Sequence, residues 1–323
     1  MNTTTDNDIK YTYTYTYLSL RVAMISLLVM LLFSVGYQLF FETNGTCLLG
    51  SISAYYYTPA RPIFVGALCA LCVCLVTYRG HSKEEDLLLN FSGIMAAVVA
   101  VVPTVPNNIC GPNAYSQTLP EIAAAVRNNI WSLVILTFLG AMFGRYLRQR
   151  IRRQQNVSPQ EKSRTTTVIT VVCAGVIGVE GFLFLISRAR FIEVSHYVAA
   201  INLVAGVTTV MLFSAFRNSE RGGQLRTDSE GARPPGAWSR EKYKRIYIVI
   251  ASTLISALAL TLVIGKLLSD SDHFVLVAEV IVIVHFCVYW GIQTRELLDL
   301  GSPTLTTMAP EPARSMHRSR LAA

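Results

Sequence analysis

Long apolar runs recur along the chain at the length that a membrane-crossing helix requires. A helix needs about 20 mostly apolar residues to cross the hydrocarbon core of a bilayer. The sequence predicts eight such segments, at residues 19–41, 62–79, 87–105, 129–147, 166–187, 196–216, 246–268 and 273–293. Backbone polar groups in lipid must pair within their own segment, and the runs do not alternate as barrel strands do. The pattern therefore predicts an all-α, polytopic membrane protein.

The first apolar run differs from a cleaved signal peptide. A secretory apolar region has about 7–15 residues and ends at small residues. Here the run that follows Arg21 continues to Phe41, and bulky aromatic residues stand at its end. We therefore expect a retained first span.

Composition agrees with one domain solvated by lipid. The chain has 323 residues, of which 52% are hydrophobic and 15% are charged. Soluble proteins average about 45–50% apolar and about 25% charged residues. We expect a low-complexity tail at residues 1–18, which contains the YTYTYTY run, and a single transmembrane domain at 19–293. A flexible linker at 217–245 and a tail at 294–323 complete the division.

The basic residues indicate an orientation. If the N-terminus is cytoplasmic, all but five of the 28 Lys and Arg residues lie on the cytoplasmic side. The exceptions are Arg61, Arg127, Arg188, Arg190 and Lys266. The positive-inside rule then predicts that both termini are cytoplasmic, in a cell membrane that we expect to be the plasma membrane. The net charge is +8. We interpret the basic residues behind it as topology determinants that also touch anionic headgroups, and we expect no nucleic-acid partner.

Two of the seven cysteines fall in predicted outer loops. Cys47 lies in the first outer loop and Cys110 in the second, and no other cysteine lies in such a loop. Because the exterior is oxidising, we predict a disulfide between them. Two unpaired thiols are the alternative.

Polar residues concentrate in the outer half of the predicted spans. Buried polar groups in membranes are costly and usually face a cavity or a partner. The residues at this level are Glu180, Glu279, Arg61, Lys266 and His196. They predict an outward-facing polar pocket. In the alternative, the two basic side chains reach the headgroups and the glutamates pair with them as structural ties.

The first outer loop is the most distinctive part of the sequence. It contains Ser53 followed by three consecutive tyrosines, Tyr55, Tyr56 and Tyr57. One interpretation is an aromatic belt at the membrane interface. The other is a loop that folds over the pocket and brings hydroxyl groups to a lipid headgroup.

Motifs for known chemistry are absent from the sequence. It has no nucleophile elbow, no HExxH, no phosphate-binding loop and no dinucleotide fingerprint. We expect no cofactor and no metal. The Asp270–His273 segment is more typical of the N-cap of the last helix, and metal binding by this segment is the alternative. Gly140 with Gly144, and the series Gly175, Gly178 and Gly181, suggest close helix packing.

Short motifs in the first outer loop and around the last span resemble one family of membrane proteins. The matching residues are Ile52, Ser53 and Pro59, together with Glu279, Thr294, Glu296 and Leu297. They resemble the Frag–DRAM–Sfk family of multispan proteins, which has bacterial relatives of unknown function and usually six spans. That family is associated with lipid remodelling, lipid distribution between leaflets and trafficking. The resemblance implies membrane lipids as the ligand class.

Together these features favour a non-enzymatic protein that binds or distributes lipid through the outer pocket. A membrane-embedded enzyme that acts on a lipid-linked substrate is one alternative. A small-solute transporter and a scaffold are the others. The sequence does not identify a catalytic residue or the lipid.

Overall fold

The computed structural model describes residues 3–80, 82–105, 110–111, 113–155, 163–224, 236–267 and 273–300. Its eight α-helices are α1 (Thr3–Tyr37), α2 (Arg61–Thr77), α3 (Lys83–Val101), α4 (Leu119–Gln155), α5 (Arg164–Ile186), α6 (Arg188–Gln224), α7 (Arg240–Leu267) and α8 (Phe274–Leu300). A π-helical turn, η1 (Gln38–Glu42), and a 3₁₀ helix, η2 (Ile52–Tyr57), lie between α1 and α2. The described residues contain helices and no β-strand, which confirms the all-α prediction.

Each predicted apolar segment falls on its own helix. Six helices, namely α1 and α4 to α8, are long and apolar enough to cross a membrane. The other two fall short for different reasons. Helix α2 has only 17 residues, and α3 begins with the acidic residues Glu84, Glu85 and Asp86. The fold is therefore compatible with a polytopic membrane protein.

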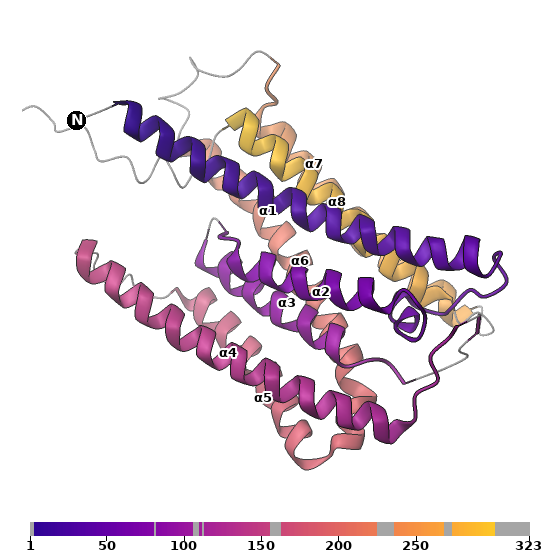
Figure 1. The fold of residues 1–323 in the computed structure, drawn as a ribbon. Coiled ribbons are helices and arrows are strands. Elements are labelled where there is room, and N and C mark those ends of the chain that lie inside the picture. The colour runs from indigo at the N-terminus through magenta and orange to yellow at the C-terminus, as the bar shows by residue number, and fades with distance from the viewer. Residues whose placement is uncertain are drawn as a thin grey trace, which may run out of the picture.

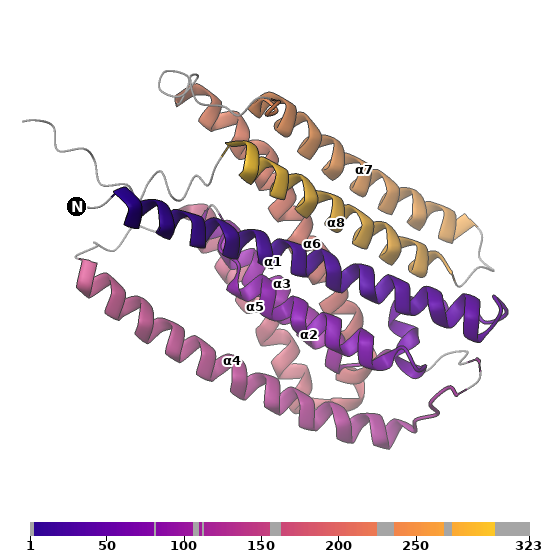
Figure 2. The ribbon, with the colours of Figure 1, turned by 45° about the horizontal axis from the view of Figure 1, so that its top comes forward.

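Six of the helices form a closed ring. Helix α1 packs against α2, which is followed around the ring by α3, α6, α7 and α8, and α8 returns to α1 (Figure 1). Helices α4 and α5 lie outside the ring, against α3 and α6. Figure 2 shows α4 along the edge of the bundle opposite α7. The ring therefore contains most of the buried core.

Helix α3 is the most enclosed helix, and glycines allow its neighbours to approach. An added Cβ at Gly93 would lie 2.9 Å from Val76 Cγ2, and one at Gly206 on α6 would overlap Ser92 Oγ. These two glycines set the α2–α3 and α3–α6 contacts. The glycines of α4 and α5, which the sequence suggested for close helix packing, have no such neighbours. Gly140 and Gly144 on α4, and the α5 glycines, meet at most the far end of one arginine in this chain.

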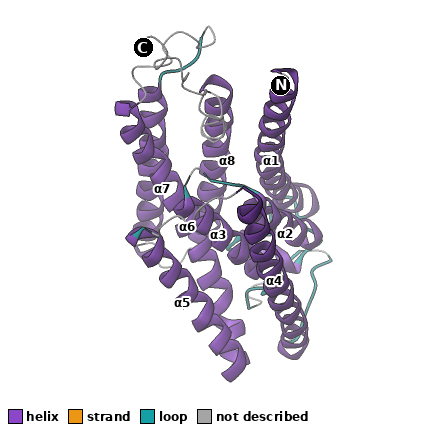
Figure 3. Ribbon diagram, turned by 90° about the vertical axis from the view of Figure 1, so that its left-hand side faces the viewer, coloured by secondary structure: helices purple, strands orange, loops and turns teal. Residues whose placement is uncertain are grey.

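Helices extend into both of the expected tails. Helix α1 begins at Thr3, within the expected tail at residues 1–18, and α8 ends at Leu300, within the one at 294–323. Tyr11 and Tyr15 are four residues apart and stack at 6.1 Å between ring centroids, because that spacing puts them on one helix face. Figure 3 places the start of α1 and the end of α8 at the same end of the bundle. Residues 225–235 of the expected linker and 301–323 of the C-terminal tail lie outside the described residues.

Candidate functional site

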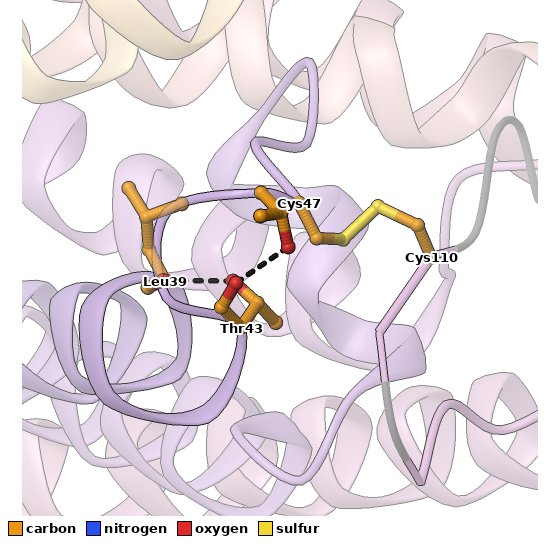
Figure 4. The surroundings of a disulfide bond; sticks show 5 residues. Leu39, Thr43, Cys47 and Cys110 are labelled. Carbon is orange, nitrogen blue, oxygen red and sulfur yellow. Dashed lines mark hydrogen bonds between the residues drawn. A yellow bond between two sulfur atoms is a disulfide. The ribbon is translucent and has the colours of Figure 1, made fainter.

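The loop that joins α1 to α2 closes one end of the ring. We call residues 43–60 the cap loop. A disulfide joins its Cys47 to Cys110, with 5.8 Å between the two Cα atoms, which confirms the predicted pairing (Figure 4). At the start of the loop, the Thr43 hydroxyl donates to the carbonyl of Leu39 at 2.7 Å (Figure 4). The cap loop is thus tied to the end of α1 and to the α3–α4 connection.

Helix η2 buries the three tyrosines of the cap loop. The Ser51 hydroxyl caps it by accepting from the Ala54 backbone amide at 3.1 Å. A 3₁₀ helix has three residues per turn, so consecutive side chains point about 120° apart. Tyr55, Tyr56 and Tyr57 therefore enter different parts of the core, and each is less than 5% exposed. The rings do not form an exposed aromatic belt.

A chain of hydrogen bonds joins η2 to two distant helices. Glu279 on α8 accepts from the Ile52 backbone amide at 2.5 Å and from the Ser53 hydroxyl at 3.2 Å. On the other side of Ser53, its Oγ lies 2.8 Å from Nε2 of His196, a residue of α6. The His196 Nδ1 atom lies 2.5 Å from the carbonyl oxygen of Val102. We call Ser53, His196 and Glu279 the Ser53 junction.

The number of available protons limits the hydrogen bonds that Ser53 can make in the Ser53 junction. The Val102 carbonyl can only accept, so Nδ1 of His196 carries a hydrogen. If Nε2 accepts from Ser53, the Ser53 hydroxyl has no proton left for Glu279, which still accepts from the Ile52 amide. If Nε2 donates instead, Ser53 donates to a charged Glu279. The single Ser53 proton can therefore serve only one of its two contacts, and when Ser53 donates to Glu279 it accepts from Nε2 of His196.

The other predicted site residues make different contacts. Glu180 on α5 accepts a hydrogen bond from Ser195, the residue before His196. Arg61, the first residue of α2, donates from Nη2 to the Tyr56 hydroxyl at 2.6 Å and lies 4.2 Å from the centroid of that ring. Among the described residues no carboxylate forms an ion pair with Arg61. The Lys266 side chain lies outside the described part of the chain.

The predicted set therefore divides into the closed Ser53 junction, the separate contact between Glu180 and Ser195, and the cation Arg61. Ser53 is 4% exposed and His196 is 2% exposed, so their hydrogen bonds are shielded. The two glutamates accept from hydroxyl and amide groups rather than from Arg61. Arg61 is only partly buried and is the member of the set with donors still available on its guanidinium.

Sequence reasoning missed a second polar cluster near the other end of the ring. Arg21 on α1 is 2% exposed. It donates to the Tyr78 hydroxyl, at 2.6 Å from Nη2, and to the backbone carbonyl of Gln293. Its guanidinium also lies 5.8 Å from the Trp290 ring centroid. Arg21 resembled an ordinary topology residue in the sequence, because its partners come from α8 and from the end of α2.

Neither a metal-binding group among the described residues nor a match to known proteins gives further information on the site. The described residues contain no group of three His, Cys, Asp or Glu side chains that could hold a metal ion, and residues 270–272 of the Asp270–His273 segment lie outside them. Comparison with protein-family models, curated proteins and solved structures finds no match to the chain.

Replacement of Ser53 tests the Ser53 junction. In Ser53→Ala, His196 Nε2 and Glu279 Oε1 lose their shared partner inside the core. An unpaired buried polar group costs about 1–3 kcal/mol, so the apparent melting temperature should fall by several degrees. The matched control is Ser252→Ala, which removes an exposed hydroxyl bonded only to carbonyls of its own helix. Equal melting temperatures for both variants would contradict a junction that holds the cap loop.

Proposed function

We propose that this chain is a multispan membrane protein that binds phospholipid at the end of the bundle closed by the cap loop. Eight helices would cross the bilayer, with both termini in the cytoplasm and the cap loop outside. The observation that carries the proposal is Arg61, a cation without a carboxylate partner among the described residues, held against an aromatic ring.

The position of Arg61 suits the phosphate of a lipid headgroup. It begins α2, and the apolar residues of that helix follow directly from Pro62. The guanidinium would therefore lie where hydrocarbon gives way to headgroups. A guanidinium has five N–H donors in a planar fork that matches phosphate, and the contact to Tyr56 uses one of them.

The cap loop would keep this cation in place. A freely moving arginine loses side-chain entropy when it binds, whereas Arg61 is already stacked on Tyr56. Tyr56 belongs to η2, and η2 is tied to α6 and α8 through the Ser53 junction. The Ser53 junction would therefore support the binding residue and would not contact lipid itself. Distribution of lipid between leaflets remains the wider role that we propose.

Replacement of Arg61 tests the lipid site. The protein would be purified in detergent, and its bound phospholipid would be counted by native mass spectrometry. Loss of a charge-assisted hydrogen bond costs about 1.5–3 kcal/mol, so Arg61→Gln should lower phospholipid occupancy roughly tenfold. Arg127→Gln, at an exposed arginine expected on the same side, is the control and should not change it. Equal occupancy in the two variants would refute the site.

Cysteine labelling tests the orientation. In intact cells, an impermeant maleimide should label Cys47 and Cys110 only after an impermeant reductant has opened their disulfide. A tag at the C-terminus should react with antibody only after the membrane is permeabilised. The variant Cys47→Ser/Cys110→Ser reports the background from the other five cysteines. Labelling of the disulfide cysteines only after permeabilisation would reverse the proposed orientation.

One observation favours an enzymatic function as a second candidate. Ser53 Oγ is within hydrogen-bond reach of His196 Nε2, and the Val102 carbonyl orients the imidazole. A nucleophile, a base and a group that orients the base are the parts needed for acyl transfer. If the cap loop opened, Ser53 could attack a lipid ester. Its proton would pass to His196 and then to the departing alcohol, leaving an acyl-serine.

A fluorophosphonate probe distinguishes this candidate from a purely structural junction. An activated serine should be labelled in native membranes, and labelling should disappear in Ser53→Ala and in His196→Gln. Heat-denatured protein is the control for nonspecific reaction. An unlabelled native protein would leave Ser53 with its structural role only.

A further inference from the structure

The end of α4 carries a dense group of arginines. The five are Arg145, Arg148, Arg150, Arg152 and Arg153, and all five are exposed. The sequence contains no Asp or Glu between Glu121 and Glu161. Within the described residues none of the five forms an ion pair with a carboxylate. The positive charge of this segment is therefore not balanced by the described part of the chain.

Part of this group lies on one face of the helix. A shallow surface depression is lined by Tyr146, Gln149, Arg150, Arg153 and Gln154, whose spacing of three and four residues puts them on one face. We call the five lining residues the basic face. The last turn of a helix also favours cations, because the carbonyl end of the helix dipole is negative.

The depth of the basic face follows from the apolar part of α4. Only 6% of the apolar window of this helix is buried by the rest of the protein. Such a helix is stable when lipid tails surround it, and its exposed large apolar side chains continue past Phe143 to Leu147 and Ile151. At a rise of about 1.5 Å per residue, Arg150 and Arg153 lie roughly 5–10 Å beyond Leu147 along the helix axis. Arginine side chains are long enough to reach from there to the headgroup layer.

We propose that the basic face binds the headgroup of an anionic phospholipid in the leaflet at this end of the bundle. The charges are complementary, and Arg150 and Arg153 can each present a planar fork to phosphate. A nucleic acid would need the same charges, but the apolar part of α4 fixes them beside the bilayer surface. This inference goes beyond the lipid site at Arg61, because it concerns the end of α4, on another helix, and a different set of residues.

Hydrogen–deuterium exchange in nanodiscs tests the proposal with the full chain. Exchange of the backbone amides of residues 144–155 would be compared in phosphatidylcholine alone and in phosphatidylcholine with phosphatidylglycerol. The anionic lipid should slow this exchange several-fold at low salt and much less at high salt, because such contacts are screened. In Arg150→Gln/Arg153→Gln the difference between the two lipid mixtures should disappear. These side chains are exposed, so the variant should keep the wild-type melting temperature.

A matched variant shows whether the effect belongs to the basic face. Arg240→Gln/Arg245→Gln removes two arginines at the start of α7 and should retain the slowing on α4. The proposal is overturned if phosphatidylglycerol slows exchange equally in the variant of the basic face, or if it has no effect on the wild type. Equal protection by inorganic phosphate in phosphatidylcholine nanodiscs would overturn the proposal and show that the basic face binds an isolated phosphate ion. Protection by an added RNA oligonucleotide and not by phosphatidylglycerol would also overturn it and show that the basic face binds nucleic acid.

Discussion

Polar groups inside an apolar bundle must find partners, and the Ser53 junction meets this requirement where the cap loop enters the ring. Ser53 is 143 residues from His196 and 226 residues from Glu279 along the chain. One hydroxyl therefore connects the second half of the protein to the loop after its first helix. Because each of the three side chains has a hydrogen-bond partner, the junction joins these segments without leaving one of these polar groups unpaired in the core.

Arg21 solves a related problem with different chemistry. A buried guanidinium is costly, and here a phenol hydroxyl, a backbone carbonyl and two aromatic rings surround it. These contacts join α1 to α8 and to the end of α2. The ring is thus tied near one end by the Ser53 junction and nearer the other by Arg21, with apolar packing between them. Loss of either tie would leave a polar group stranded inside the bundle.

Helices α4 and α5 differ from the ring because little of their surface is covered by the chain. Their apolar side chains and their glycines face outward, so the surroundings have to provide the contacts that a ring helix receives from its neighbours. In a bilayer, lipid tails can do this at no hydrophobic cost. The same arrangement leaves the arginines of α4 exposed, while Arg61 is held against Tyr56 of the cap loop.

The sequence by itself determined the helices, which depend on local apolar runs, and the disulfide, whose two cysteines both fall in predicted outer loops. Apolar runs of sufficient length form helices wherever they lie, and Cys47 had one plausible partner in Cys110. Tertiary structure alone decided which helices form the ring and which glycines pack. Gly93 and Gly206 matter because of what lies opposite them, and this depends on helices that are distant in sequence. For the same reason the predicted pocket separated into the Ser53 junction, the Glu180–Ser195 contact and Arg61, since a hydrogen bond requires a particular distance and direction that residue type and depth do not specify.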